Sequence, residues 1–277
     1  MKKETKYNIF AGVLILVILF FGIRNLQKEG FVVEWNSPSR DKITFLSAKE
    51  TAKFIMSDPD NYTHNLNGWD LIARNVSTEI DYRRQAASAA LEFSEDQKSR
   101  LKSAAAKADK FFACYKSDPN QTNDYVDISG KDIAAIPWIF ALTDDSVYED
   151  GMPHTRANTI FLSTIVDETP RHLFKILVHE KVHLYQRLYP KQCVAYLASH
   201  GFIQWKMRQG VPRIRSNPDV DPWIYIELQS SKPLMALYVS DRPKNISDTV
   251  TAFDDISYEH PYELMAYTIE KHALESY

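Results

Sequence analysis

The segment between Thr169 and Pro190 constrains the fold more than any other part of the chain. It contains no glycine, and its single proline, Pro170, is its first residue. Proline is tolerated in the first turn of a helix, where its missing N–H is not needed. Apolar residues recur around much of the helix circumference, at Leu173, Ile176, Leu177, Val178, Val182, Leu184 and Leu188. The sequence therefore predicts a long helix that is buried on most of its sides.

The polar residues of this largely apolar helix include His179, Glu180 and His183. Polar side chains in a buried helix cost free energy unless they have partners. Positions i and i+4 share one face of a helix, so His179 and His183 can point ring nitrogens at a single ion about 2.0 to 2.1 Å away. A zinc ion would supply the missing partner. The alternative is that both histidines are core residues bonded to the backbone.

The pattern His179-Glu180-x-x-His183 resembles the signature of the zincin metallopeptidases. The resemblance implies one bound zinc ion, with Glu180 as the general base that takes a proton from the attacking water. In the gluzincin branch, the third zinc ligand is a glutamate on a later helix. The stretch "HPYELMAY" (residues 260–267) is similar to such a segment and implies Glu263 as that ligand.

Two positions near Glu263 leave the ligand set open. His260 lies about one turn earlier and is the alternative third ligand. Thermolysin-like enzymes carry an aspartate four residues after the ligand glutamate, which orients a histidine ligand. Tyr267 occupies that position here, so the orienting partner is unassigned. Tyr267 is instead a candidate hydrogen-bond donor to the oxyanion of the transition state.

The stretch Ala157 to Ser163 precedes the predicted metal helix and is rich in residues typical of strands. The resemblance implies that it is the edge strand of a sheet and pairs with an extended substrate. His154 and Arg156 would then lie at the end of the cleft as substrate contacts, or alternatively cap a turn.

Helical patterns dominate up to about residue 116, and short strand-like runs occur at 134–143 and 157–163, before the metal helix. This order predicts an α+β fold. With the resemblance, it implies a zincin-like domain with a helical N-terminal part, a small mixed sheet and a long helix bearing the motif. A net charge of -3 and a scattered distribution of Lys and Arg argue against nucleic-acid binding.

An uncharged apolar run at residues 9–23 predicts a transmembrane anchor. Counted from Tyr7 it has about 17 residues, the lower limit for a membrane-spanning helix, and no small-x-small cleavage site follows it. We therefore expect a tail at 1–8, a stalk at 24–45 and a catalytic domain at 46–277. This domain would face away from the cytosol, in an extracytoplasmic, lumenal or viral-envelope setting.

Two further features bear on such a setting. Cys114 and Cys193 form either one disulfide or two buried thiols, and their spacing does not decide between these. Four Asn-x-Ser/Thr sites fit a translocated glycoprotein, and they lie at Asn61, Asn75, Asn120 and Asn245.

The sequence thus favours a membrane-anchored zinc metallopeptidase whose partners are a peptide or protein substrate and, through the N-terminal helix, the membrane. The alternative is a non-catalytic anchored protein that keeps a zincin-like fold as a structural or binding module. Glu180 argues against this alternative, because a structural zinc site does not need a general base.

Overall fold

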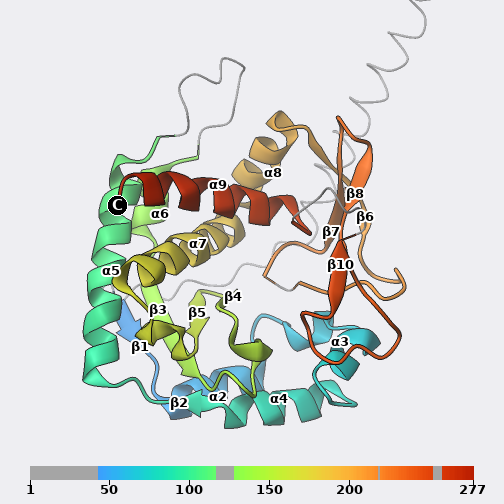
Figure 1. Cartoon of the computed structure of the whole chain (residues 1–277), viewed down its shortest axis with the longest axis horizontal. Coiled ribbons are helices and arrows are strands. Elements are labelled where there is room, and N and C mark those ends of the chain that lie inside the picture. The colour runs from blue at the N-terminus through green and yellow to red at the C-terminus, as the bar shows by residue number, and fades with distance from the viewer. Residues whose placement is uncertain (1–42, 117–127, 218, 252–257) are drawn as a thin grey trace, which may run out of the picture. The chain divides into compact units, whose positions relative to one another are not determined.

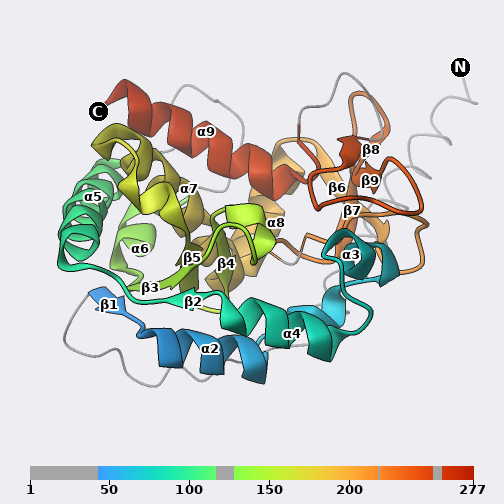
Figure 2. The same ribbon diagram turned by 60° about the horizontal axis from the view of Figure 1, so that its bottom comes forward.

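Helices cover both faces of a small five-stranded sheet in the computed structural model, which describes residues 43–116, 128–217, 219–251 and 258–277 (Figures 1 and 2). The predicted mixed α+β fold class is confirmed. The strands of this sheet are β1 (Ile43–Phe45), β2 (Ala90–Leu91), β3 (Trp138–Thr143), β4 (His154–Arg156) and β5 (Thr159–Leu162).

The side chains of the central strands alternate between two helical layers. Phe140 and Leu142 of β3 belong to the larger core, which also includes residues of α5, α6, α7 and α9, whereas Ala141 packs with α2 and α4. Strand geometry explains this division, because successive side chains point to opposite faces. The helices are α2 (Ala48–Ser57), α4 (Glu79–Ser88), α5 (Glu95–Cys114), α6 (Gly130–Ala135), α7 (Pro170–Leu188) and α9 (Pro261–Glu275).

The remaining elements are five strands that follow α7 in the chain and several short helices. A three-stranded antiparallel sheet has the order β6-β7-β8, and β9 pairs with β10. These strands are β6 (Phe202–Met207), β7 (Trp223–Glu227), β8 (Lys232–Leu234), β9 (Ala236–Tyr238) and β10 (Thr249–Thr251). The short helices are η1 (Thr63–Asn65), α3 (Gly68–Ala73), η2 (Glu149–Gly151), η3 (Thr164–Asp167) and α8 (Pro190–Ser199).

The long helix expected after Thr169 is present as α7. The Thr169 hydroxyl accepts a hydrogen bond from the N–H of His172, and Pro170 occupies the first turn. The helix packs against α5 and α9 and is buried along most of its length. Lys181, a charged residue inside the motif, is fully buried, forms an ion pair with Asp109 of α5 and lies 3.8 Å from the ring centroid of Trp138. These contacts compensate for the burial of its charge.

The order of the strands corrects the prediction for residues 157–163. β5 lies between β3 and β4, so it is an interior strand, and the strand at this edge of the sheet is β4. The chain reverses at Ala157, which has a φ of 48°, and β4 pairs antiparallel with β5. The edge position therefore belongs to the three residues that precede the predicted strand.

No helix in the described part of the chain is both long and apolar enough to cross a membrane. The longest two, α5 with 20 residues and α7 with 19, carry charged side chains along their lengths. The prediction of a single-pass membrane protein with an extracytoplasmic, lumenal or viral-envelope domain is corrected on this finding. The expected tail, the anchor at 9–23 and most of the stalk lie outside the described residues.

Two smaller expectations are also decided. Residues 43–45, assigned to the stalk, form β1 and pair with β3, so the folded part begins before residue 46. Cys114 is exposed and Cys193 is buried, and both are free thiols.

Candidate metal centre

α7 and α9 lie side by side and bring His179, His183 and Glu263 together (Figures 1 and 2). The two Nε2 atoms are 3.1 Å apart, and Glu263 Oε2 lies 3.3 Å from Nε2 of His179 and 3.5 Å from Nε2 of His183. Ligands of a tetrahedral zinc ion with bonds of 2.0 to 2.1 Å are about 3.3 to 3.4 Å apart. These three residues therefore fit a single zinc ion.

The outer nitrogens of both histidines have partners on the protein. Nδ1 of His179 lies 3.2 Å from Glu270 Oε2, and Nδ1 of His183 lies 2.8 Å from Gln186 Oε1. When each Nδ1–H donates to its oxygen acceptor, each neutral ring presents an unprotonated Nε2. Two such lone pairs at 3.1 Å repel one another unless a cation lies between them. The hydrogen bonds thus prepare both rings to bind a metal.

The electrostatics of the cluster also favour a positive charge. Burial opposes protonation of His179, but its hydrogen bonds to Glu263 and Glu270 outweigh this effect and raise its pKa to about 10. Burial alone would raise the pKa of Glu263, whereas His183 and His179 hold it well below the usual range. Glu263 is therefore an ionised carboxylate, the form that a metal ligand requires.

The two residues that orient the histidines were missed in the sequence. Glu270 follows Glu263 by seven residues, two turns along the same face of α9, and Gln186 follows His183 by three. Gln186 also donates a hydrogen bond to the backbone oxygen of Tyr262, which ties α7 to the start of α9. Helical spacing could have indicated them, because each lies on the same helix face as a predicted ligand.

Glu180 lies beside this cluster, and its Oε2 has no partner among the residues that the structure describes. The residue is buried, and no hydrogen bond is made to Oε2 within the described residues. Burial raises the pKa of Glu180 to about 7, against the opposing effect of His179 and His183. Two carboxyl groups of one cleft, the buried Glu180 and the partly buried Glu263, thus have pKa values shifted in opposite directions: Glu263 stays ionised, and Glu180 titrates near neutral pH.

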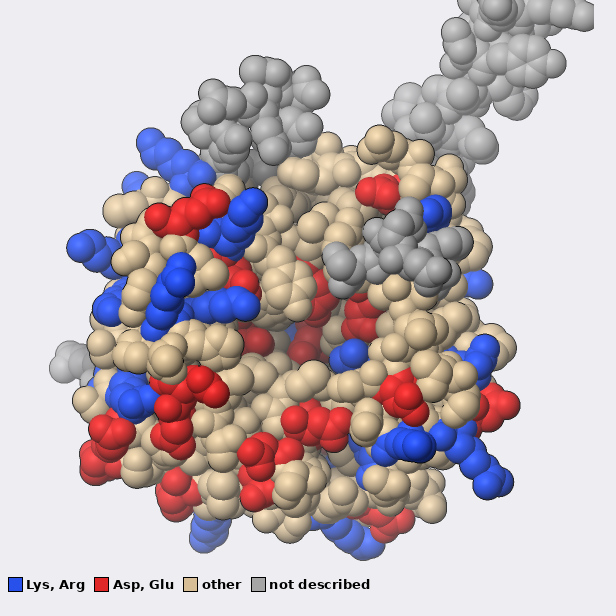
Figure 3. Space-filling model, viewed as in Figure 1, with Lys and Arg blue, Asp and Glu red and all other residues tan. Residues whose placement is uncertain are grey.

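A cleft of about 460 Å³ opens onto this cluster. Figure 3 shows the same face hollowed near its centre, with acidic side chains gathered around the hollow. Its walls include Tyr267, whose ring lies 4.7 Å from that of His179 and is half exposed. His154 also lines the cleft; its Nδ1 donates to the Met152 carbonyl, whereas its buried Nε2 has no partner within the described residues.

Two other residues singled out in the sequence have structural contacts instead. Arg156 is fully buried, forms ion pairs with Asp58 and Asp60, and is not among the residues that line the cleft. His260 caps α9: its Nδ1 accepts the N–H of Tyr262, and its Nε2 donates to Asp221. Both nitrogens of His260 therefore have partners, and the third member of the cluster is Glu263.

Comparisons of the chain with protein-family models, with curated proteins and with solved structures found no match.

Proposed function

We propose that this protein is a zinc-dependent peptidase of the gluzincin type, with a zincin-like arrangement of the motif helix and the ligand helix. The observation that carries the proposal is the convergence of His179 Nε2, His183 Nε2 and Glu263 Oε2 in an open cleft, next to the unpartnered oxygen of Glu180. Zinc, when bound by these three residues, would supply a Lewis acid that polarises the scissile carbonyl and acidifies water.

Glu180 carries the proton transfers in this proposal. Its Oε2 takes a proton from the water that attacks the carbonyl carbon, and the same oxygen then delivers that proton to the leaving amine nitrogen. This role requires an oxygen without a hydrogen bond from the protein, and within the described residues Oε2 accepts none. Tyr267, on the cleft wall beside His179, is the proposed donor to the developing oxyanion.

The second candidate is a structural or binding protein with the same cluster. Structural zinc sites are usually closed by four protein ligands, whereas catalytic sites have three and an open position. Among the described residues, this cluster offers three potential ligands, His179, His183 and Glu263, and it borders a cleft. A buried carboxylate without a partner also costs free energy, and the structural role gives no reason for it. Both observations favour the enzyme.

The test is the zinc content of the full chain, measured by elemental mass spectrometry. We expect one zinc per chain, its loss in His183→Ala and Glu263→Ala, and its retention in two controls on the same helices, His172→Ala and Glu275→Ala. Glu180→Gln should keep zinc and lose hydrolysis of a mixed peptide library by about 100-fold or more. Wild-type protein without zinc, or Glu180→Gln with full activity, would overturn the proposal.

A further inference from the structure

The edge strand β4 forms part of the cleft wall, with His154 and Pro153 among the lining residues. On one side β4 pairs with β5, in a register that places Thr155 opposite Ile160. The other side is the edge of the sheet. A free edge beside a substrate cleft offers backbone N–H and C=O groups with which an extended peptide can pair.

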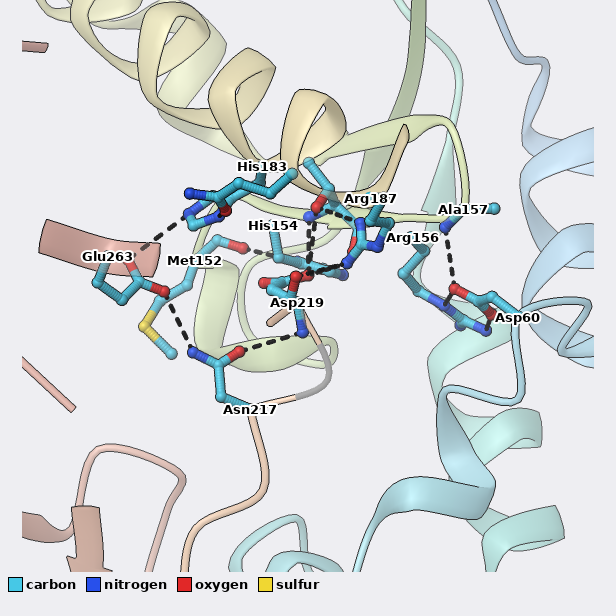
Figure 4. Close-up of polar contacts among 12 residues, drawn as sticks. Asp60, Met152, His154, Arg156, Ala157, His183, Arg187, Asn217, Asp219 and Glu263 are labelled. Atoms are coloured by element: carbon cyan, nitrogen blue, oxygen red, sulfur yellow. Dashed lines mark hydrogen bonds and ion pairs between the residues drawn. The ribbon is translucent and has the colours of Figure 1, made fainter. Parts of the chain in front are cut away.

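Here those edge groups are already bonded to side chains (Figure 4). The N–H of Thr155 donates to Asp219 Oδ1 at 3.1 Å, and its carbonyl accepts from Arg187 Nη2 at 2.9 Å. Two residues further on, the N–H of Ala157 donates to Asp60 at 3.0 Å. Two residues before Thr155, Pro153 has no N–H to offer. An extended peptide therefore cannot pair with β4 while these contacts persist.

Asp219 and Arg187 also bind one another, close to the metal ligands. Arg187 Nη2 lies 3.2 Å from Asp219 Oδ1, and the same guanidinium donates to the Thr155 hydroxyl at 2.6 Å. Arg187 follows His183 by four residues, one turn along α7. Asn217 completes the link, because its amide donates to Glu263 and its oxygen accepts the N–H of Asp219 (Figure 4).

We propose that Asp219 and Arg187 determine the substrate specificity of this cleft. They occupy the backbone-pairing positions of Thr155, and they thereby exclude extended polypeptides and restrict cleavage to short peptides. The inference rests on the proposed peptidase activity. It differs from simple protection of a sheet edge because the closed edge is itself a wall of the cleft that holds Glu180 and the metal ligands.

The test compares wild type, Asp219→Ala and Asp219→Asn as full-length, zinc-loaded proteins. The alanine variant removes the acceptor and frees the Thr155 N–H, whereas asparagine keeps a side-chain oxygen that can accept this N–H. Quenched fluorescent peptide mixtures of three and of ten residues are used far below KM, so that the initial rates report kcat/KM. Thermal melting and zinc content show whether each variant is folded and loaded.

Asp219→Ala should raise the ratio of kcat/KM for long over short peptides about fivefold, the effect of one backbone hydrogen bond recovered at the Thr155 N–H, and Asp219→Asn should change it by less than about twofold. The inference would be equally supported if, of the three proteins, only Asp219→Ala cleaved the long peptides. An unchanged ratio in an active alanine variant would overturn the inference and leave the proposed peptidase intact. No cleavage of either length by any of the three proteins would overturn both.

Discussion

At the scale of single residues, Glu263 and Glu270 have different roles in the candidate metal centre. Glu263 contributes an oxygen to the ligand cluster, and Glu270, two turns later on α9, accepts a hydrogen bond from Nδ1 of His179. Glu270 also lies 3.4 Å from Lys175, which neutralises part of its charge. Glu270 thus sets the orientation and the protonation of the His179 ring without itself being a member of the ligand cluster.

Replacement of Glu270 should weaken the site without removing a ligand. We expect Glu270→Gln to lower zinc affinity about 10- to 100-fold, because the amide is a weaker acceptor for the His179 Nδ1–H and a poorer orienting group. Competition with a chromophoric chelator measures the change. Glu275→Gln, an exposed position on the same helix, is the matched control, and equal affinities of the two variants would contradict the orienting role.

The sequence was informative about single residues where chemistry and helical spacing coincide. His179, Glu180 and His183 lie within one turn, and Glu263 begins a second helix, so local patterns were sufficient to nominate them. His154 and Tyr267 also lie on the cleft wall. Arg156 does not, because its guanidinium is held by Asp58 and Asp60, almost 100 residues earlier in the chain. Sequence spacing contains no signal for such a pairing.

At the scale of elements, a buried ion pair joins α3 to the segment before β4. Arg74, which caps α3, donates to both oxygens of Glu149 in η2, and Tyr82 of α4 donates to the same carboxylate. Burial raises the pKa of Glu149, but Arg74 outweighs it and lowers the pKa to about 2. The pair therefore stabilises the fold wherever Glu149 is ionised in the native state.

Loss of this carboxylate should be costly near neutral pH. We expect Glu149→Gln to lower the free energy of unfolding by about 3 to 5 kcal/mol at pH 7, because Arg74 would remain buried without a counter-charge. A native pKa below the unfolded value means that the contribution is complete above about pH 4.5 and is lost as the pH falls towards 2. The difference in the free energy of unfolding between wild type and Glu149→Gln should therefore become smaller at acidic pH.

Urea unfolding at pH 7 and at pH 3 measures both effects. The control is Glu79→Gln, which removes a partly exposed ion pair with Arg83 and should cost less than about 1 kcal/mol. A gap for Glu149→Gln that is the same at both pH values would show that the ionised carboxylate is not the source of the stability.

The sequence predicted which segments are helices or strands better than it predicted which strands pair with one another. Caps such as Ser47 and Ser94 mark helix starts through contacts three residues away, and both are present. Residues 202–207 form β6, because the chain turns at Gly201, where φ is 82°, and then pairs with β7. Pairing between distant strands also placed β4, not β5, at the sheet edge. These outcomes depend on tertiary contacts, which local propensity does not encode.

At the scale of the whole molecule, the candidate metal centre lies where two distant parts of the chain meet. α7 follows the sheet directly, whereas α9 ends the chain after the small sheets. Their contact buries Leu177, Met265 and Ile269 in the main core, and Gln186 adds a hydrogen bond to Tyr262. A metal ion bound by both helices would add a further link between them.

Zinc should therefore stabilise the fold as a ligand of the native state. At a free zinc concentration of about 100 times Kd, linkage predicts about 2.7 kcal/mol of added stability, which for a domain of this size corresponds to a rise in Tm of about 5 to 10 °C. Differential scanning calorimetry of the chelator-treated and the zinc-loaded protein measures the difference. In His183→Ala the shift should nearly disappear, whereas His172→Ala should keep it. A shift of equal size in His183→Ala would mean that zinc binds elsewhere, and the link between α7 and α9 would then have to come from side-chain packing alone.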